Sequence, residues 1–500
     1  MVGWDSDAEL AAGSCLGVEC GMQACAPQFV RLLGAGLLVL AGLVVFTTGG
    51  AFSTAPVRVG GGLVLAGLGW ALALGDRSEV WSPRVWGWVL FIAIAGRSVA
   101  LIADAELSDD LWRYGWEGAL VLEGESPYSS PPNARSEQQA RWASTYGRLN
   151  NVDISAAYPP VTQAFSAVVV ALTVGRAGPV EAELDPAPVA ERLELGLRLA
   201  FGLVELATVW PLLVLMRRWR ALRGVLLGWL WSPLLMVEFW GSAHFDSLGV
   251  LALAWALVGL TGPEAGASAG ASKITRSSII GGVALGLAVA VKYLPVLIVP
   301  CLRRRIWPIV GLTVLVVTLP VGLLEGGYAG LFTGLSEYGL RWESWNLGYR
   351  QVEAVLASAF AFDESWSDPR RLGRGLALLV IAAMVLFRAR RGLRLIESAY
   401  WILGTFLIVS PTLHPWYLAW VLFPLLFTVS LTRWAWVYLV VVSPLLYAPL
   451  VAWHARGEWS VPGWTAWVCG LPFWILFVLG LVLDRRRGHE SNALVSRDAR

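Results

Sequence analysis

The sequence predicts an all-α polytopic membrane protein with about 12 transmembrane helices and two shorter membrane segments. Of its 500 residues, 56% are hydrophobic and only 15% are charged, whereas soluble domains carry about 25% charge. Apolar runs near the ~20 residues that cross a bilayer recur along the chain. They lie at 30–48, 58–75, 85–103, 194–216, 222–240, 244–262, 306–324, 372–389, 396–412, 415–431, 433–452 and 464–483.

These runs form one expected membrane domain, 29–484, between a cytoplasmic N-terminal tail, 1–28, and a basic C-terminal tail, 485–500. The first apolar run lacks a convincing cleavage site, so we expect no cleavable signal peptide. The net charge of +2 is close to neutral and gives no sign of nucleic-acid binding. We expect membrane lipids as neighbours and the cell inner membrane as the location.

Basic residues predict which loops face the cytoplasm, because short loops rich in Arg and Lys normally stay inside. The clusters are Arg77 and Arg84, Arg217 to Arg223, Lys273 and Arg276 in the linker 262–277, Arg303 to Arg305, Arg388 to Arg394, Arg433, and Arg485 to Arg487. Placing them inside leaves five segments outside: 104–157, Gly241–Asp246, 325–370, Thr412–Trp416 and 454–462.

The same count predicts that two segments enter the membrane and return. Segment 279–302 joins two basic loops and should turn near Lys292–Pro295. Segment 158–175 joins the outer loop 104–157 to the acidic loop 176–192, which also falls outside. Non-helical backbone at membrane depth survives only where protein or a water-filled cavity covers it. Two such segments therefore predict a central cavity.

Asp109 and Asp110 follow an apolar run and stand at the predicted outer edge of the membrane. A carboxylate there can act as a general base or bind a divalent cation. Alternatively, Ser108 or Asp109 is the cap of a helix that starts at this point. Both can hold, with Asp109 as cap or helper and Asp110 facing the cavity.

Three further ionisable residues lie between or inside apolar runs: His244, Asp246 and Lys292. Ionisable residues at membrane depth are functional candidates. For the first two the alternative is a helix cap with a solvated histidine. Lys292 is one of only two lysines, against 36 arginines. A lipid phosphate or a distant carboxylate would partner it, and the alternative is a lysine that reaches the membrane surface.

Aromatic and proline motifs mark the starts of two apolar runs. Tyr158-Pro159-Pro160 opens one, and His414-Pro415-Trp416-Tyr417 opens the other. The alternative is an interfacial aromatic belt with helix-starting prolines. The outer loop 325–370 carries Arg341, Trp342, Trp345, Asn346 and Arg350, which suit sugar stacking and phosphate contacts, although a packed loop would look similar.

These motifs together resemble a known family. They are DLWRYGWEG from Asp110, GESPY ending at Tyr128, YPP from Tyr158, WSPL from Trp231, GSAHFD ending at Asp246, VKYLP around Lys292 and SPTLHPWY ending at Tyr417. In this order they resemble GT-C membrane glycosyltransferases, in particular bacterial polyprenyl-phosphate-mannose-dependent α-mannosyltransferases and the GPI mannosyltransferase that adds the first mannose. The resemblance covers about 105–420.

The resemblance implies transfer of a hexose, with mannose expected, from a polyprenyl-phosphate donor to a lipid-linked or cell-envelope glycan on the outer face. It implies that Asp110 is the catalytic base, with Asp109 as a less secure partner. The residues expected to bind the donor phosphate or lipid are Lys292, Arg113, Tyr293 and Arg341. Those expected to bind substrate are Tyr114, Tyr128, Tyr158, His244, Asp246, Asn346, His414 and Trp416.

No cofactor is certain, although Asp110 could hold a divalent cation such as Mg or Mn. Ser108 stands where the eukaryotic relative has the first acid of an Asp-x-Asp pair, which leaves metal dependence open. A lone base that activates one acceptor predicts inversion at the anomeric carbon.

The alternative function is a transporter or flippase of lipid-linked sugars, because interrupted helices are also a transporter feature. A transporter should show internal pseudo-symmetry, which the sequence lacks, and polar residues at the midplane. Here the polar residues gather at the predicted outer face.

Overall fold

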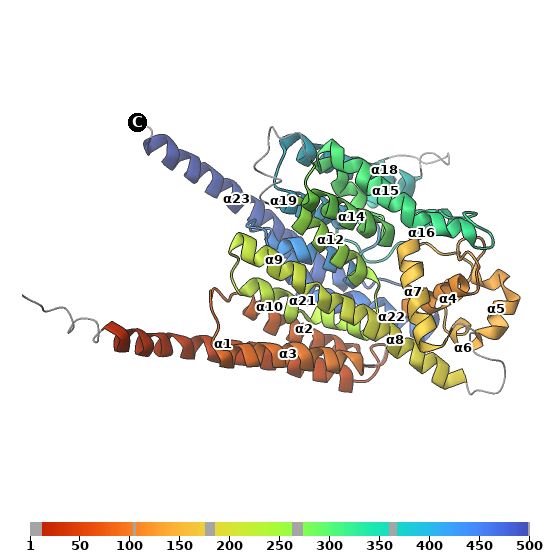
Figure 1. Cartoon of the computed structure of the whole chain (residues 1–500), viewed down its shortest axis with the longest axis horizontal. Coiled ribbons are helices and arrows are strands. Elements are labelled where there is room, and N and C mark those ends of the chain that lie inside the picture. Colours follow the sequence, from red (N-terminus) through yellow and green to blue (C-terminus); the bar gives the residue numbers. More distant parts are fainter. Residues whose placement is uncertain (1–12, 104–106, 176–185, 263–273, 360–367, 499–500) are drawn as a thin grey trace, which may run out of the picture.

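The computed structural model describes residues 13–103, 107–175, 186–262, 274–359 and 368–498. In these ranges the regular structure is helical, apart from one isolated bridge between Glu125 and Glu325. Figure 1 shows helices lying side by side along the long axis, with α1 (Gly13–Thr48) and α23 (Leu471–Asp498) extending from one end. The chain is therefore an all-α polytopic membrane protein, as the composition predicts.

Within the described ranges, nine helices are long and apolar enough to cross a membrane. They are Gln28–Thr48, Pro56–Ala73, Pro83–Leu101, Pro188–Trp219, Gly224–Gly241, Arg304–Leu323, Pro369–Arg391, Arg433–Arg456 and Ala466–Arg487. Each overlaps a predicted span. Five shorter apolar helices coincide with the other three predicted spans and with both predicted short segments.

Local sequence sets where these helices begin and end. Pro occupies the first turn of α2 (Pro56–Ala73), α3 (Pro83–Leu101) and α18 (Pro369–Arg391), where its missing N–H costs nothing. The Ser82 hydroxyl caps α3 by accepting a hydrogen bond from the backbone N–H of Val85. Gly392 ends α18 with φ 57°, the left-handed conformation that glycine adopts without strain.

Close helix packing depends on small residues at two crossings. α12 (Asp246–Leu260) and α14 (Arg276–Val291) approach so closely that a Cβ on Gly259 would lie 2.6 Å from the Cα of Gly281. In the same way α4 (Asp110–Leu122) meets α7 (Pro160–Thr173), where a Cβ on Gly118 would lie 2.6 Å from the carbonyl carbon of Ser166. Small residues let helix backbones approach in membranes.

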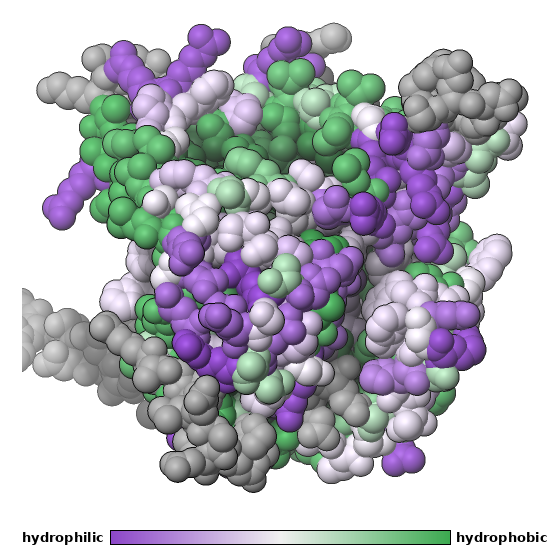
Figure 2. All heavy atoms as spheres, turned by 90° about the vertical axis from the view of Figure 1, so that its right-hand side faces the viewer, coloured by the Kyte–Doolittle hydropathy of each residue, from purple (hydrophilic) through white to green (hydrophobic). Residues whose placement is uncertain are grey.

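The segments predicted to lie outside contact one another at one end of the molecule. The Ser126 N–H donates to the Glu325 carbonyl (2.8 Å), and the Leu413 N–H donates to the Trp345 carbonyl (2.7 Å). The Trp459 indole N–H donates to the Ser344 hydroxyl at 3.4 Å. This end carries α4, α5 (Ser136–Arg141), α6 (Ala143–Tyr146) and α16 (Thr333–Arg341), away from the terminal helices (Figure 1). Figure 2 shows hydrophilic residues gathered across this end.

Basic segments likewise contact one another or neighbouring helix ends. The Arg223 guanidinium donates to the Glu79 carbonyl at 2.9 Å, and that of Arg218 donates to the Val258 carbonyl at 2.7 Å. The two sets of loops are thus grouped as the positive-inside rule predicts, and the membrane side that each set faces stays a prediction.

The two short segments differ from each other. α14 ends at Val291, Lys292 is extended (φ −151°, ψ 131°), and the 3₁₀ segment η3 (Leu294–Cys301) follows. The helix is therefore interrupted at Lys292, as predicted, and the return of this segment to the same face stays a prediction. In 158–175, by contrast, α7 is one unbroken helix of 14 residues. The prediction that this segment turns back on itself is wrong, because its prolines start the helix and none interrupts it.

The remaining helices complete the bundle around these elements. They are η1 (Pro132–Ala134), α8 (Pro186–Ala207), α9 (Val209–Trp219), α10 (Gly224–Leu230), α11 (Pro233–Leu235), the π-helical η2 (Met236–Gly241), η4 (Arg304–Ile306), α15 (Trp307–Thr318), η5 (Leu319–Leu323), α17 (Tyr349–Ala359), α19 (Leu395–Val409), η7 (Pro415–Tyr417), α20 (Leu418–Leu425), α21 (Arg433–Val442), η8 (Ser443–Tyr447), α22 (Pro449–Arg456) and the π-helical η9 (Ala466–Gly470).

Candidate functional site

Predicted site residues from four distant parts of the chain meet at the loop-bearing end. Asp110 Oδ2 lies 4.0 Å from His244 Nδ1, and the His244 ring stacks on Trp416 with ring centroids 3.8 Å apart. Lys292 Nζ lies 2.7 Å from Asp246 Oδ1. Asp246 is only two residues from His244, so the acid, the imidazole, the indole and the ammonium form one cluster.

Asp109 and Asp110 share one hydrogen-bond donor. The Asn150 amide donates to Oδ1 of Asp109 (2.6 Å) and to Oδ1 of Asp110 (3.0 Å). The Ser108 hydroxyl accepts from the backbone N–H of Asp110 (3.3 Å) and caps α4, whereas Asp109 makes no side-chain cap bond. Asp109 thus occupies the N-cap position of α4 without capping through its side chain, and of the two predicted residues it is Ser108 that accepts the hydrogen bond.

Desolvation raises the pKa of both Asp109 and Asp110, and both residues lie outside the candidate spans. The pKa of Asp110 is raised to about 6, mainly by desolvation and also by the neighbouring charge of Asp109, while the Asn150 hydrogen bond acts against both. Desolvation also raises the pKa of Asp109. Because the Asp110 side chain keeps 20% of its exposure, it can reach a ligand. A carboxylate with a pKa near neutrality suits general-base chemistry.

His244 and His414 both stack on the Trp416 indole. Trp416 stacks on His244 at 3.8 Å and on His414 at 4.4 Å, with interplanar angles of 18° and 1°. His244 is 0% exposed, so the alternative of a solvated histidine is wrong. Desolvation lowers the pKa of His244 well below its ordinary value and that of His414 to about 3. Both rings are therefore neutral at pH 7.

Lys292 has the distant carboxylate that the sequence left open as a partner. Its ammonium donates to Asp246 Oδ1, and the Trp420 indole N–H donates to the same oxygen. The ammonium also lies 3.9 Å from the Tyr417 ring centroid, a cation–π contact. The Asp246 side chain makes these contacts and does not cap α12. Its Oδ2 is buried and has no hydrogen-bond partner in the described part of the chain.

Aromatic rings line the cluster on the side of α4 and form its wall. Tyr158 lies 4.4 Å from Phe245 and 6.0 Å from Tyr114, between ring centroids. The Tyr128 hydroxyl donates to the Tyr158 carbonyl at 2.8 Å, so Tyr128 supports the wall from behind. Across the cluster the hydroxyls of Tyr417 and Tyr338 are hydrogen-bonded, which ties α16 to the site.

Four other predicted residues have contacts of their own. The Arg113 guanidinium binds Glu117 (2.9 Å) and the carbonyls of Asn151 (3.1 Å) and Ile154 (3.0 Å). These contacts anchor the outer loop, and the phosphate contact of Arg113 stays a prediction. The remaining three have their contacts elsewhere in the described part of the chain. Asn346 accepts from the backbone N–H of Arg350 in the first turn of α17, Arg341 pairs with Glu337 on the surface, and Tyr293 packs on Phe332.

The acids do not form a ready metal site. Among the residues that the structure describes, no group of three or more His, Cys, Asp or Glu side chains could hold a metal ion. Between Asp109 and Asp110 stands an N–H donor, the Asn150 amide, where a shared cation would need to bind. The donor set of the described residues thus does not fit the divalent cation that the sequence left open for Asp110.

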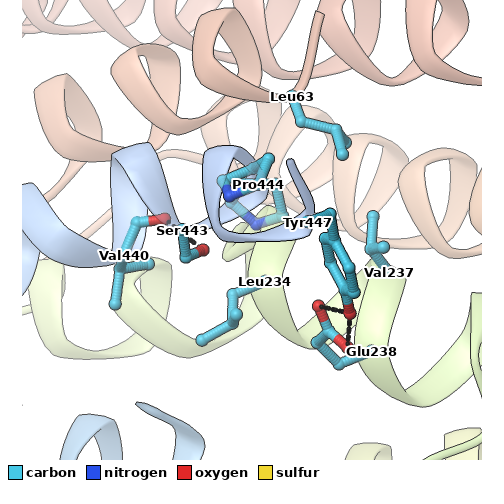
Figure 3. Close-up of a pocket in the computed structure, with 9 residues that line it drawn as sticks. Leu63, Leu234, Val237, Glu238, Val440, Ser443, Pro444 and Tyr447 are labelled. Carbon is cyan, nitrogen blue, oxygen red and sulfur yellow. Dashed lines mark hydrogen bonds between the residues drawn. The ribbon is translucent and has the colours of Figure 1, made fainter. Parts of the chain in front are cut away.

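Sequence reasoning missed Glu238, which lies beneath the imidazole. Its Oε2 is 3.4 Å from His244 Nε2, and the Tyr447 hydroxyl contacts both carboxylate oxygens at 2.9 and 3.0 Å. Figure 3 shows Tyr447 and Glu238 facing each other in a pocket between η2 and η8. A second missed pair, Arg97 and Glu205, is buried and bidentate, with bonds of 2.9 and 2.7 Å. All of them interrupt apolar runs, which was a usable signal.

No protein-family model matches the chain, and neither a curated protein nor a solved structure matches it.

Proposed function

We propose that the chain is a GT-C-type glycosyltransferase that transfers a hexose, mannose in this proposal, from a polyprenyl-phosphate donor to a lipid-linked or cell-envelope glycan. The reaction takes place on the extracytoplasmic face of the inner membrane. One observation carries the proposal: Asp110, with a pKa raised to about 6, shares an aromatic-walled cluster with the Lys292 ammonium. A base can take the proton of the acceptor hydroxyl, and a cation in the same site can stabilise the departing phosphate.

In the proposed reaction Asp110 takes the proton of the acceptor hydroxyl. The acceptor oxygen bonds to the anomeric carbon as the bond from that carbon to the phosphate oxygen breaks, and the phosphate leaves with the electron pair. This single displacement inverts the anomeric carbon, so a β-linked donor gives an α-mannoside. Asp110 contributes as a general base, an effect typically worth about 10²–10⁴-fold in rate.

Lys292 stabilises the leaving phosphate. An ammonium has three N–H donors, and Asp246 accepts one of them. The other two can face phosphate oxygens, because the Lys292 side chain keeps 17% of its exposure. Asp246 and the Tyr417 ring hold the ammonium in place, so that its charge is already positioned as the phosphate becomes more negative.

The membrane arrangement belongs to the same proposal. The nine long helices and three of the five shorter ones would make 12 crossings, with α7 and the pair α14–η3 as the two short segments. The loop-bearing end would then face outward, where polyprenyl-linked sugars and envelope glycans meet.

The test uses purified protein with radiolabelled polyprenyl-phosphate mannose and glycolipid acceptors. Wild type should transfer label, and Asp110→Asn should abolish transfer at unchanged protein level. Asp153→Asn, an exposed acid of the same loop, is the matched control and should stay within about twofold of wild type. Full activity of the Asp110→Asn protein would exclude Asp110 as the base. Movement of lipid-linked sugar across proteoliposomes without transfer would favour a flippase.

A further inference from the structure

We propose that His244 and Glu238 form a buried relay that takes over the proton which Asp110 removes from the acceptor. This inference rests on the proposed function and assigns two positioning residues to it. The relay runs inward from the partly exposed Asp110 to a carboxylate that is 2% exposed.

The imidazole lies between the two acids. His244 Nδ1 is 4.0 Å from Asp110 Oδ2, and His244 Nε2 is 3.4 Å from Glu238 Oε2. Nε2 is buried and has no aligned hydrogen-bond partner among the described residues. The Tyr114 hydroxyl lies 3.4 Å from Nδ1. A histidine retained only for packing would not need a carboxylate near each ring nitrogen.

The surroundings hold the ring in this orientation. Trp416 stacks on one face, and the backbone N–H of His244 donates to the Glu238 carbonyl at 2.9 Å. Ala243, just before it, has φ 57° and is fully buried. The residue that aims the ring is thus in the left-handed conformation that non-glycine residues rarely adopt, and such strain is concentrated at functional sites.

The charged and titratable neighbours of the relay come from several elements. Asp110 and Tyr114 face His244 from α4, Glu238 faces it from η2, and His414 stacks on the same Trp416 ring. Lys292 acts on His244 through space and disfavours a positive ring. Tyr447 from η8 contacts Glu238 and donates to its carboxylate. The ring therefore passes a proton on more readily than it stores one.

The proton moves as follows. Asp110 becomes protonated as the acceptor oxygen bonds to the anomeric carbon. Its Oδ2–H then gives the proton to Nδ1 while the Nε2 proton passes to Glu238 Oε2, so the imidazole changes tautomer and stays neutral overall. After the products leave, the same path in reverse returns the proton to Asp110 and to water. The 4.0 Å gap must close by about 1 Å, as apo distances commonly do on substrate binding.

The decisive experiment is rescue by imidazole. His244→Ala should lower kcat at least ~30-fold with the donor KM within about twofold, and added imidazole should restore a large part of kcat. The matched control is His414→Ala, which removes the other ring stacked on Trp416, and imidazole should not change its rate. Glu238→Gln keeps its shape and a Tyr447 contact, so it should fold, lose kcat to a similar degree and resist rescue.

Each outcome bears on one claim. His244 is fully buried, so His244→Ala can fail to fold, and Glu238→Gln therefore tests the relay on its own. A kcat of Glu238→Gln within about twofold of wild type overturns the relay while the transferase stands. A folded His244→Ala protein that imidazole does not rescue also overturns it. A wild type that transfers no sugar from any polyprenyl-phosphate donor overturns the proposed function, and the relay with it.

Discussion

Lowering the pH should slow sugar transfer in a way that the surroundings of Asp110 specify. In the proposed reaction Asp110 works as the base only as a carboxylate, and burial raises its pKa to about 6 from an ordinary 3.8. A group with a pKa near 6 is about 9% deprotonated at pH 5, so kcat/KM there should be about one tenth of its value above pH 7. With an ordinary pKa the rate would fall only below about pH 4.

Two variants should shift the fall of kcat/KM at low pH, the acid limb of the pH–rate profile, in opposite directions. Asp109→Asn removes the neighbouring negative charge that raises the Asp110 pKa, so the limb should move to lower pH. Asn150→Ala removes the hydrogen bond that lowers the pKa, so the limb should move to higher pH. Opposite shifts from two neighbours of one carboxylate would identify that carboxylate as the titrating group.

The assay is the initial rate of transfer at limiting substrate from pH 4.5 to 8, with protein integrity checked at each pH. The reasoning fails if wild type keeps its full kcat/KM at pH 5. It also fails if the limb moves upward in Asp109→Asn, since the carboxylate being titrated would then not be Asp110.

Three further predictions concern donor binding, stability and a buried pair. Lys292→Ala, made together with Asp246→Asn so that no buried acid is left alone, should raise the donor KM at least ~10-fold and the acceptor KM little, because bonds to charged groups contribute about 1.5–3 kcal/mol; steady-state kinetics with an unchanged donor KM would exclude the phosphate role. At pH values above 6, the Asp110→Asn protein should unfold at a higher temperature than wild type. The folded pKa of about 6 exceeds 3.8, so ionisation costs the fold up to about 3 kcal/mol there, a cost that shrinks as pH falls toward 4; equal gains at pH 4 and 7.5 would contradict this. Arg97→Met should cost about 3–5 kcal/mol by leaving Glu205 unpaired, and Arg97→Met with Glu205→Leu should recover most of it; thermal unfolding that shows no recovery would refute the coupling.

Run length and composition predicted the fold well because a bilayer fixes the length of a crossing. Departures occur where prolines shorten helices. α19 ends at Val409, because Ser410 precedes Pro411 and a residue before proline avoids the α region. Charge parity identified both short segments but could not distinguish a short straight helix from a hairpin. α7 proved to be the former, and the chain breaks at Lys292 as predicted.

The site was predictable as a set of residues and less so as a set of contacts. Lys292 and Asp246 are 46 positions apart, and Trp420 is 174 from Asp246, so no local pattern announces their meeting. Asn150 sits in a polar loop with no motif around it. Glu238 was within reach of sequence reasoning, since an acid inside an apolar run is costly and needs a reason.

Irregular backbone explains how Glu238 and His244 can face each other at all. In a continuous α-helix residues six positions apart point about 120° away from each other, because each residue turns 100°. Here the π-helical η2 ends at Gly241, and Ala243 reverses the chain at φ 57°, which costs an alanine about 1–2 kcal/mol. The reversal brings the His244 N–H to the Glu238 carbonyl and the imidazole over the carboxylate. A regular helix would be more stable locally and would separate the imidazole from the buried acid, so the strain is retained where the proposed chemistry needs both.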